Sequence, residues 1–598
     1  MVNLGPSARA YDGHVLGLQQ GSVHLTLTIE SPSPDALAAA ERYFSGCLGQ
    51  HVAEGAWAQS EGDDLAMRLA GRIADWTAAL QHQVHIPVSR TFFLRPMRRA
   101  ERGMTVYVAL PCTHKALLLR ALRWVIGAMR DVAQGRTSPG DGALDRLLEE
   151  LRGGSEPGTN TFHIAQAAYR LGMPVRRPLS GAPMQRALLI GTGCRGRWLD
   201  STMTDRTSAL GVRLAGDKAS TARLLREVGL PGATHEFAAS AQEAIAVAER
   251  LGYPVVIKPA DRDQGLGVAA DLRTQGEVES AFENARRHSR AILVERHCNG
   301  ATHRLSVANG QLVKVVKRLA GGVTGDGVHT IAELVSRSES DPQRRQRRTR
   351  TGQTVLSLDE EAQALLARAD LGPDSIPDAG VHVRLRRRDN VNAGGTNQLI
   401  PLDQVHPDNR ALALRVAELM RLDIAGIDLI LEDIGRSWLA QQALICEVNA
   451  QPQMGVLGAE DLYCELLRDL FVNGGRVPVA LALLSEAQPV DDTLRERVRR
   501  WSQARTLAHA GGVFLEGQRI SGAFPSGYAA GAAALTLPQT ESLLLVMTVD
   551  DVLRHGLPVD RVDRIGLVEA GSGSPDTRRL RDQALMLLGP CSAVLEHW

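Results

Sequence analysis

The chain has 598 residues, which at roughly 100–200 residues per domain allows several domains and needs no disulfide or structural metal for folding. Its 68 basic and 67 acidic residues leave a formal net charge of +1, less than a protein that binds nucleic acid through its phosphates usually carries. Widely spaced cysteines predict a reduced, cytoplasmic protein. The sequence has no signal-peptide core near its start and no apolar run near the ~20 residues that span a bilayer, so we expect neither a nucleic-acid nor a membrane partner.

The first 157 residues mix short strand and helix patterns. Residues 24–29 alternate polar and apolar side chains, which predicts a half-buried strand. Residues 116–132 carry apolar side chains at helical spacing, and the Gly/Ser/Pro-rich stretch 153–160 is typical of a linker. We therefore expect an N-terminal α/β domain over residues 1–157.

Helix and strand patterns alternate from residue 158 to 485. A short apolar strand is predicted at 255–259, and two neighbouring strands at 425–434 and 443–453. The region from 486 to 598 opens with a charged helix predicted over 491–509. Alternation of this kind predicts an α/β (α+β multidomain) protein with three parts. The Arg-rich stretch 341–352 is interpreted as a solvated loop.

The motif GTGCRG at 191–196 follows an apolar run and has the spacing of a dinucleotide-binding turn. No amphipathic helix follows it, and Arg197-Trp198 stands where a phosphate-binding loop has Lys-Ser/Thr. A plain turn or a loop beside the substrate is the alternative interpretation, and we favour it.

A stronger set of residues begins with two lysines. Lys218 starts a helical pattern, and Lys258 ends the strand at 255–259, just before a loop with Gly265 and Gly267. A lysine there can meet phosphate oxygens as a point charge, and glycines let backbone N–H groups approach phosphates. Each feature alone is more often an ordinary surface turn. Glu295 ends a further apolar strand, where an acid can accept a hydrogen bond from an adenine amino group.

Carboxylate and amide side chains follow in the last two predicted strands of this region. Asp428 lies in one strand, and Glu447 and Asn449 are two residues apart in the next, so both face the same side. Oxygen ligands of these types suit Mg²⁺, and a carboxylate in an apolar strand is costly unless paired or metal-bound. Because all these features occur together and in order, the sequence predicts a site for ATP and Mg²⁺.

This order of residues resembles the ATP-grasp ligases, and several stretches resemble the cyanophycin synthetases in particular. They are STMTDRTSALGVRLAGDK, YPVVIKPADRDQGLGV, GDGVHTIAELV, HPDNRALALRVAELMRLDIAGIDL and EVNAQP. The resemblance implies a central ATP-grasp fold over residues 158–485. It also implies that Lys218 and Lys258 hold ATP phosphates under a lid formed by Gln264, Gly265, Gly267 and Val268.

The same resemblance assigns the remaining roles. Mg²⁺ would be bound by Asp428, Glu447 and Asn449, and Arg304 would stabilise the charge that develops on the transferred groups. The terminus of the peptide chain would be bound by residues between 386 and 396, which are Arg386, Asn390, Gly394, Gly395 and Thr396. Departures from the family pattern are Thr302, where an acid is usual, and the altered loop at 390–396, which place the acceptor's identity in doubt.

Both ends of the chain also resemble this family. The N-terminal region has Arg72-Ile-Ala-Asp-Trp76 where some members carry a metal site for making primers, so we expect no such peptidase. Residues 486–598 resemble a truncated Mur-ligase-like domain, and the phosphate loop that ATP chemistry needs is missing between 470 and 515. We expect this domain to be inactive, as in the short type called cyanophycin synthetase 2.

The expected activity follows from the resemblance. A peptide carboxylate acceptor would be activated with ATP and joined to the amine of a dipeptide donor, β-aspartyl-arginine above all, in a homo-oligomeric enzyme. Two alternatives stay open: a ligase for a different dipeptide or amine, and a pseudo-ligase that partners a full-length synthetase.

Overall fold

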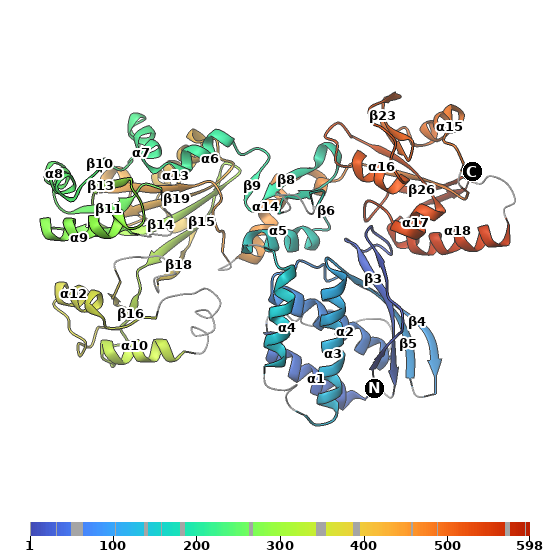
Figure 1. Ribbon diagram of the computed structural model, residues 1–598, viewed down its shortest axis with the longest axis horizontal. Helices are drawn as coiled ribbons and strands as arrows, with labels where there is room; N and C mark the ends of the chain where they lie inside the picture. Colours follow the sequence, from blue (N-terminus) through green and yellow to red (C-terminus); the bar gives the residue numbers. More distant parts are fainter. Residues whose placement is uncertain are drawn as a thin grey trace. The chain divides into compact units, whose positions relative to one another are not determined.

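The computed structural model describes the chain except for residues 1, 31–32, 50–63, 102, 137–141, 157, 180–185, 262–266, 342–354, 387–394, 456–458, 487, 569–573, 593 and 598. The chain forms two compact units (Figure 1). One combines Met1–Ser201 with Gly458–Trp598, and the other is the continuous segment Thr202–Leu457. The boundaries 1–157, 158–485 and 486–598 stay a prediction.

The N-terminal part of the first unit is an antiparallel sheet with helices packed on one face (Figure 1). Its strands run in the order β1-β3-β5-β4, and β2 pairs with β3. The predicted strand at 24–29 lies within β3, and the predicted helix at 116–132 is α3, so both predictions are confirmed. The elements are β1 Val2–Leu4, β2 Arg9–Tyr11, β3 Ser22–Glu30, β4 Phe93–Ala100, β5 Gly103–Pro111, α1 Pro34–Leu48, α2 Leu65–Gln83, α3 Lys115–Ala133 and α4 Ala143–Leu151.

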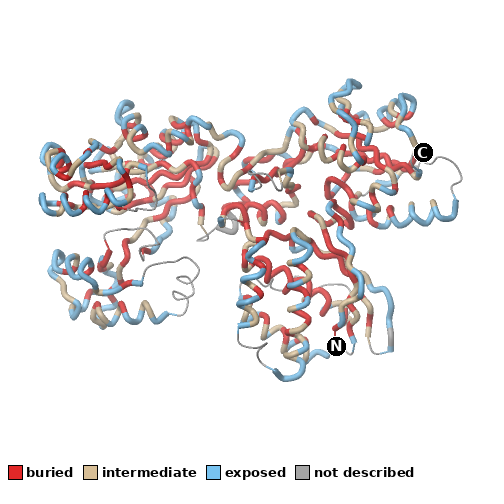
Figure 2. Tube along the Cα trace, in the orientation of Figure 1, coloured by how far each residue is buried: buried red, intermediate tan, exposed pale blue. Residues whose placement is uncertain are grey.

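The C-terminal part of the same unit is a seven-stranded sheet in the order β24-β23-β22-β25-β21-β26-β27. Its centre is parallel, and β21 is buried along its whole length. Much of the trace through this part is coloured as buried in Figure 2. The elements are β21 Val479–Leu484, β22 Thr506–His509, β23 Gly512–Leu515, β24 Gln518–Arg519, β25 Leu543–Thr548, β26 Arg564–Val568, β27 Leu595–His597, α15 Asp492–Ser502, α16 Gly527–Ala534, α17 Val549–His555 and α18 Pro575–Leu588.

One predicted element in this part is wrong. The helix expected over 491–509 ends at Ser502, where Gln503 takes the left-handed conformation, with φ of 55°. Residues 506–509 form β22 instead, because their buried side chains complete the parallel sheet beside β25.

Helix α5 (Thr159–Arg170) and the short strands β6 (Val175–Arg176), β7 (Leu188–Ile190) and β8 (Arg197–Asp200) join the two parts of this unit, together with α14 (Ala459–Leu470). The Tyr463 hydroxyl donates to Asn160 Oδ1 at 2.8 Å, and the Tyr463 ring stacks on His163 at 5.3 Å between ring centroids. The two stretches of chain that make up this unit are therefore in direct contact at α5 and α14.

The second unit contains two sheets and a small subdomain. A four-stranded sheet in the order β10-β13-β11-β12 carries α8 and α9, and a five-stranded sheet in the order β18-β15-β14-β19-β20 carries α13 (Figure 1). The predicted strand at 255–259 is β11, as expected. The small subdomain pairs β16 with β17 and packs α10 and α12 around an apolar core.

The bounds in this unit are β9 Met203–Thr204, α6 Ala209–Gly216, α7 Lys218–Glu227, β10 His235–Ala238, α8 Ala241–Leu251, β11 Val255–Pro259, β12 Ala269–Leu272, α9 Gln275–Arg286, β13 Ile292–Arg296, β14 Ala301–Ala308, β15 Gln311–Leu319, β16 Gly322–Thr324, α10 Ile331–Ser340, α12 Glu360–Arg368, β17 His382–Arg384, β18 Thr396–Ile400, α13 Pro407–Leu419, β19 Ile424–Leu431 and β20 Ala443–Asn449.

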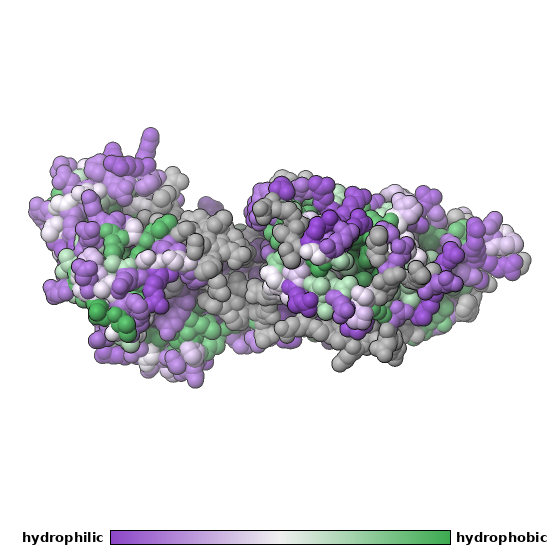
Figure 3. All heavy atoms as spheres, turned by 90° about the horizontal axis from the view of Figure 1, so that it is seen from below, coloured by the Kyte–Doolittle hydropathy of each residue, from purple (hydrophilic) through white to green (hydrophobic). Residues whose placement is uncertain are grey.

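The surface is largely polar. Hydrophilic side chains cover much of the face seen in Figure 3, with smaller hydrophobic areas between them. Exposed apolar residues of the small subdomain include Val328, Ile376 and Val381. Within the described residues, we find no helix with both the length and the apolar character that crossing a membrane requires.

Candidate active site

Lys258 and Glu295 form a buried ion pair in the four-stranded sheet. They lie on neighbouring antiparallel strands, β11 and β13, and Lys258 Nζ is 2.7 Å from Glu295 Oε1. The two side chains are 9 % and 5 % exposed. Burial alone would lower the pKa of Lys258, but the charge and hydrogen bond of Glu295 outweigh it and raise that pKa. The lysine therefore stays protonated, as a phosphate-binding group requires.

The five-stranded sheet has one apolar and one polar face. Leu305, Ile427 and Val448 belong to the apolar core that α13 covers. Arg304, Asp428 and Glu447 occupy directly opposed positions on three adjacent strands, so they share the other face. This arrangement follows from the period of two along each strand.

Asp428 is held by two arginines. Arg304 Nη2 donates to Asp428 Oδ2 at 2.8 Å while its Nε donates to the other carboxylate oxygen, a bidentate pair. Arg318 Nη2 lies 3.3 Å from Asp428 Oδ2. Burial by itself lowers the pKa of Arg304, but the hydrogen bonds and charge of Asp428 raise it overall. The face thus combines fixed positive charge with a buried carboxylate.

One cavity joins the residues of both sheets. It is lined by Lys218 from α7, Lys258 and Glu295 from the four-stranded sheet, and Glu447 from β20, with Thr221 and Cys446 beside them. The structure thus brings together residues that lie far apart in the sequence. A more open hollow runs along α18 in the other unit, and its lining contains none of the predicted site residues.

The oxygen donors fit a magnesium ion in kind. Asn449 is paired in register with Gly426 and lies two residues from Glu447, so it shares the polar face. Its side-chain Nδ2 is buried with no hydrogen-bond partner in the described part of the protein. This donor suits an acceptor such as a phosphate oxygen, whereas only the Oδ1 of the same amide could bind a cation. No cluster of three or more His, Cys, Asp or Glu side chains suited to a metal occurs among the described residues. The candidate set is therefore two carboxylates and one amide, and Asp428 must give up part of its pairing with arginine to bind a cation.

The predicted lid and chain-binding loop are only partly described. Gln264, Gly265, Asn390 and Gly394 lie outside the described residues. Gly267 has φ of 73°, and a Cβ there would lie 3.0 Å from Pro259, so glycine is required at this position. Val268 follows it and leads into β12. Gly395 precedes Thr396, the first residue of β18, which pairs with Leu319 on β15.

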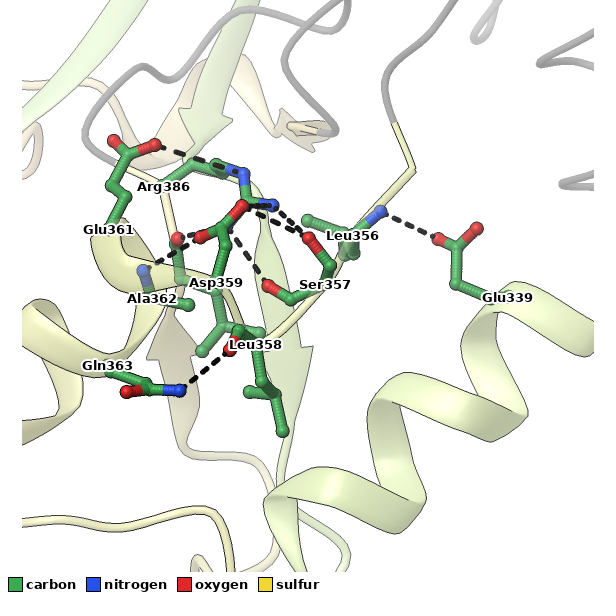
Figure 4. Close-up of polar contacts among 10 residues, drawn as sticks. Glu339, Leu356, Ser357, Leu358, Asp359, Glu361, Ala362, Gln363 and Arg386 are labelled. Atoms are coloured by element: carbon green, nitrogen blue, oxygen red, sulfur yellow. Dashed lines mark hydrogen bonds and ion pairs between the residues drawn. The ribbon is translucent and has the colours of Figure 1, made fainter.

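Arg386 is locked inside the small subdomain (Figure 4). Its side chain is 7 % exposed, and its guanidinium donates to both oxygens of Asp359, at 2.9 and 3.1 Å. The same group donates to the carbonyl and hydroxyl oxygens of Ser357. Asp359 also caps α12 by accepting from Ala362 N at 3.1 Å. In this arrangement Arg386 ties the end of β17 to the start of α12.

Two residues on the polar face were not predicted from the sequence. Lys314 and Arg318 lie on β15, and the register places Lys314 opposite Ser306 and Arg318 two positions beyond Val316, which opposes Arg304. Lys314 Nζ donates to the Met454 carbonyl at 2.7 Å, and burial lowers the pKa of this lysine. Lys314 and Arg318 are four residues apart in β15, so a strand places both on the same face. This spacing of two basic residues is the signal that could have identified them.

The glycine motif at 191–196 forms a turn, which was the favoured interpretation. Gly193–Arg195 is a short 3₁₀ turn followed by β8, where a dinucleotide site would have a helix. The backbone N–H groups of Thr192 and Gly193 donate to the carbonyls of Gly475 and Leu535, each at 2.8 Å. These amides are therefore already satisfied by the protein itself.

The N-terminal stretch at Arg72–Trp76 makes internal contacts. Arg72 pairs with both oxygens of Glu41 at 2.5 Å and with Asp75 at 3.0 Å, and Trp76 stacks on Phe44 at 4.2 Å. The expected lack of peptidase activity stays a prediction.

Comparison with known proteins identifies ATP-grasp domains in this part of the chain. The family model described as an ATP-grasp domain matches residues 212–308, and the one described as a RimK-like ATP-grasp domain matches residues 379–461. The cyanophycin synthetase of Trichormus variabilis is 37 % identical over 308 residues, covering 51 % of this chain and 33 % of that protein. The cyanophycin synthetase of Geminocystis herdmanii is 30 % identical over 433 residues, covering 70 % and 49 %.

Among solved structures, a bifunctional glutathione synthetase from Pasteurella multocida covers 75 % of this chain and 82 % of its own, with a TM-score of 0.39 and 16 % identity. The chain spans between a third and a half of the length of the two cyanophycin synthetases it matches. It is thus a homologue of the cyanophycin synthetases that carries an ATP-grasp domain.

Proposed function

We propose that the protein is an ATP-dependent ligase that activates the C-terminal carboxylate of a peptide and joins it to the amine of a dipeptide. The favoured donor is β-aspartyl-arginine, and the product is cyanophycin or a similar polymer. The observation that carries the proposal is the single cavity lined by Lys218, Lys258, Glu295 and Glu447. Homology to the cyanophycin synthetases supports the class of substrate.

The proposed reaction has two steps. A peptide carboxylate oxygen attacks the γ-phosphorus of ATP, ADP leaves, and an acyl phosphate forms. The dipeptide amine then attacks the acyl carbon, loses a proton, and displaces phosphate. Lys218 and Lys258 would offset the phosphate charge. Arg304, whose side chain pairs with Asp428 on the polar face, would offer fixed positive charge to the transferred group.

Magnesium would be held by Asp428, Glu447 and Asn449, where it would supply charge to the phosphate oxygens. Glu295 has a second task in this proposal. Its hydrogen bond keeps Lys258 oriented and charged inside a buried site, so its effect on nucleotide binding works partly through that lysine.

The test is an assay of ADP and polymer with purified protein, ATP, Mg²⁺, a primer and β-aspartyl-arginine. The proposal expects ADP release that requires both peptide substrates. ADP release only with a different dipeptide or amine would support the alternative ligase. The altered loop at 390–396 is the reason for testing that alternative. No ADP release with any pair of carboxylate and amine would refute a ligase.

Glu447→Gln separates a ligase from a pseudo-ligase partner. The change keeps shape but removes a proposed metal ligand, so turnover should fall by at least about a hundredfold. Glu432→Gln, an exposed acid just beyond β19, is the matched control and should retain turnover. A pseudo-ligase would bind its partner equally well with either substitution and show no turnover without it.

Two further properties belong to the proposal. We expect a homo-oligomer in the cytoplasm, which light scattering and cell fractionation would test. We also keep the division into an N-terminal domain (1–157), an ATP-grasp ligase (158–485) and an inactive Mur-ligase-like part (486–598).

A further inference from the structure

The five-stranded sheet of the candidate site has two edges of different character. The edge formed by β20 is covered, because Ile445 N donates to the Pro231 carbonyl at 2.7 Å and α6 and α7 pack against the strand. The opposite edge is β18, Thr396–Ile400. Within the described residues, β15 is the only strand that pairs with it, and residues 396–399 are all exposed.

The β18 edge is short and is followed by Pro401, but it carries no charged side chain and no bulge. Natural sheet edges are blunted by charged side chains, proline or a bulge, since unpaired main-chain groups otherwise recruit another strand. Residues 396–400 read Thr-Asn-Gln-Leu-Ile, and their register with β15 is uninterrupted. The strand therefore offers a short row of main-chain donors and acceptors to an extended chain.

The position of this edge connects it to the site. Asn397 opposes Arg318, whose guanidinium reaches Asp428, the partner of Arg304. Gln398 opposes Lys317. An extended peptide paired with the outer side of β18 would be separated from β15 by one strand, so it would lie near the basic residues of β15, a setting that favours an anionic chain.

We propose that the β18 edge binds the main chain of the acceptor peptide as an added strand, one strand away from the basic residues Lys317 and Arg318 of β15. The inference rests on the proposed function for its substrate and adds where and how that substrate is held. Recognition through the main chain suits a polymer, because every repeat presents the same backbone groups. A second copy of this chain is a poorer occupant, because the strand is five residues long and the charged neighbours would oppose their own copies.

Hydrogen–deuterium exchange on the full-length protein tests this inference without turnover. The probe is octa-aspartate, compared with an octa-aspartate whose alternate backbone nitrogens are methylated. We expect octa-aspartate to slow exchange in residues 396–400 by about tenfold, since protected amides exchange only on opening, and the methylated probe to have little effect.

Each other outcome overturns the inference. No protection by octa-aspartate shows that the edge is not used, and equal protection by both probes shows binding by charge without main-chain pairing. Protection that grows with protein concentration in the absence of peptide shows self-pairing. Amide exchange is measured without catalysis. The ADP assay can therefore refute the ligase proposal without affecting this test, and this test can refute the edge proposal without affecting the ADP assay.

Proline substitutions give a kinetic test. Neighbouring strand residues point their N–H groups to opposite sides, so one of Asn397→Pro and Gln398→Pro removes a bond to β15 and the other removes an outward donor. The variant that keeps the wild-type melting temperature should raise KM for the peptide roughly threefold to tenfold, as for one lost hydrogen bond, with KM for ATP unchanged. Glu432→Gln, a change at an exposed residue outside this edge, is the control and should match wild type. An unchanged peptide KM in the folded proline variant contradicts the inference.

Discussion

Lys258 and Glu295 depend on each other because both are buried. Glu295→Gln leaves a buried ammonium without its counter-charge, so we expect a loss of about 3–5 kcal/mol in the free energy of unfolding. The double variant with Lys258→Met and Glu295→Gln should lose less free energy of unfolding than the two single variants together, because it removes both charges. Urea unfolding of the wild type and the three variants measures this coupling, and additive losses would show that the pair is not coupled.

The pair also predicts a pH dependence. The pKa of Lys258 is raised in the folded protein. Its contribution to stability is therefore complete at pH values below its pKa in the unfolded chain, and is lost as the pH rises through its pKa in the folded protein. In Glu295→Gln, burial dominates and lowers the pKa of Lys258. ATP affinity of that variant should therefore fall at a lower pH than in wild type, which calorimetric titration between neutral and alkaline pH would measure. Identical pH profiles would contradict this reasoning.

His24 is a separate source of pH dependence. Burial lowers its pKa to about 4, while Ser22 Oγ lies 2.8 Å from its Nε2. Between pH 6.5 and 4 the unfolded chain binds a proton that the folded one refuses, so stability falls as pH falls, by on the order of 1–3 kcal/mol. His24→Gln should flatten this part of the profile of denaturation midpoint against pH. An unaltered slope would assign the acid sensitivity to other groups.

At the scale of elements, Gly426 lets a chain segment cross the polar face. A Cβ at Gly426 on β19 would lie 2.8 Å from Pro452 and 3.1 Å from the Arg304 side chain. The segment is also fixed by Lys314, which donates to Met454, and by Thr202, which donates to Pro452. Gly426→Ala should displace this segment together with Arg304.

The expected result of Gly426→Ala is a kcat reduced by at least about tenfold in a folded protein, since small misplacements at a reacting centre are costly. Gly276→Ala in α9 is the matched control, because a Cβ there meets no atom within 4 Å. That control should be neutral or slightly stabilising. Equal kcat values in the two variants would show that the segment does not position Arg304.

Arg386 raises a question about the small subdomain. It was expected to meet the peptide terminus, but its donors are engaged by Asp359 and Ser357 (Figure 4). Arg386→Lys keeps the charge and loses the two-pronged pairing. If Arg386 is a structural tie, both Arg386→Lys and Arg386→Met should speed amide exchange in α12. If it binds the peptide by charge, only Arg386→Met should raise the peptide KM.

At the scale of the whole molecule, the two units differ in how the chain builds them. Thr202–Leu457 is continuous, whereas the other unit needs both ends of the chain. We expect a fragment of residues 202–457 to fold and to bind ATP with an affinity similar to that of the full chain. Residues 1–201 alone should aggregate, because α5 loses its partner α14 and the apolar residues around Val15 and Leu16 lose Leu587.

Calorimetry of the intact chain checks the same division. ATP with Mg²⁺ should raise the unfolding temperature only of the transition that the 202–457 fragment also shows, because a ligand stabilises the part that binds it. At a ligand concentration of a hundred times Kd, the stabilisation is about 2.7 kcal/mol. A single transition that shifts as a whole would show that the two units unfold together.

The sequence alone was enough to predict the chemistry of the site. Lys258, Glu295, Asp428 and Glu447 lie within apolar strand patterns or at their ends, Lys218 starts a helical pattern, and short-range pattern is enough to place them there. It could not decide pairings made by distant strands. Arg304 meets Asp428 across 124 residues, and Arg318 and Lys314 join them only through the register of β15.

Only the tertiary structure decided the remaining features. Residues 506–509 continue a helical pattern locally but become a strand, because a buried parallel sheet has a place for them. Arginine is usually exposed, but the tertiary structure buries the Arg386 side chain and pairs it with Asp359. The physical reason is common to these cases: local pattern determines which side chains can be buried or charged, whereas the partner that makes burial or charge favourable comes from a segment far along the chain.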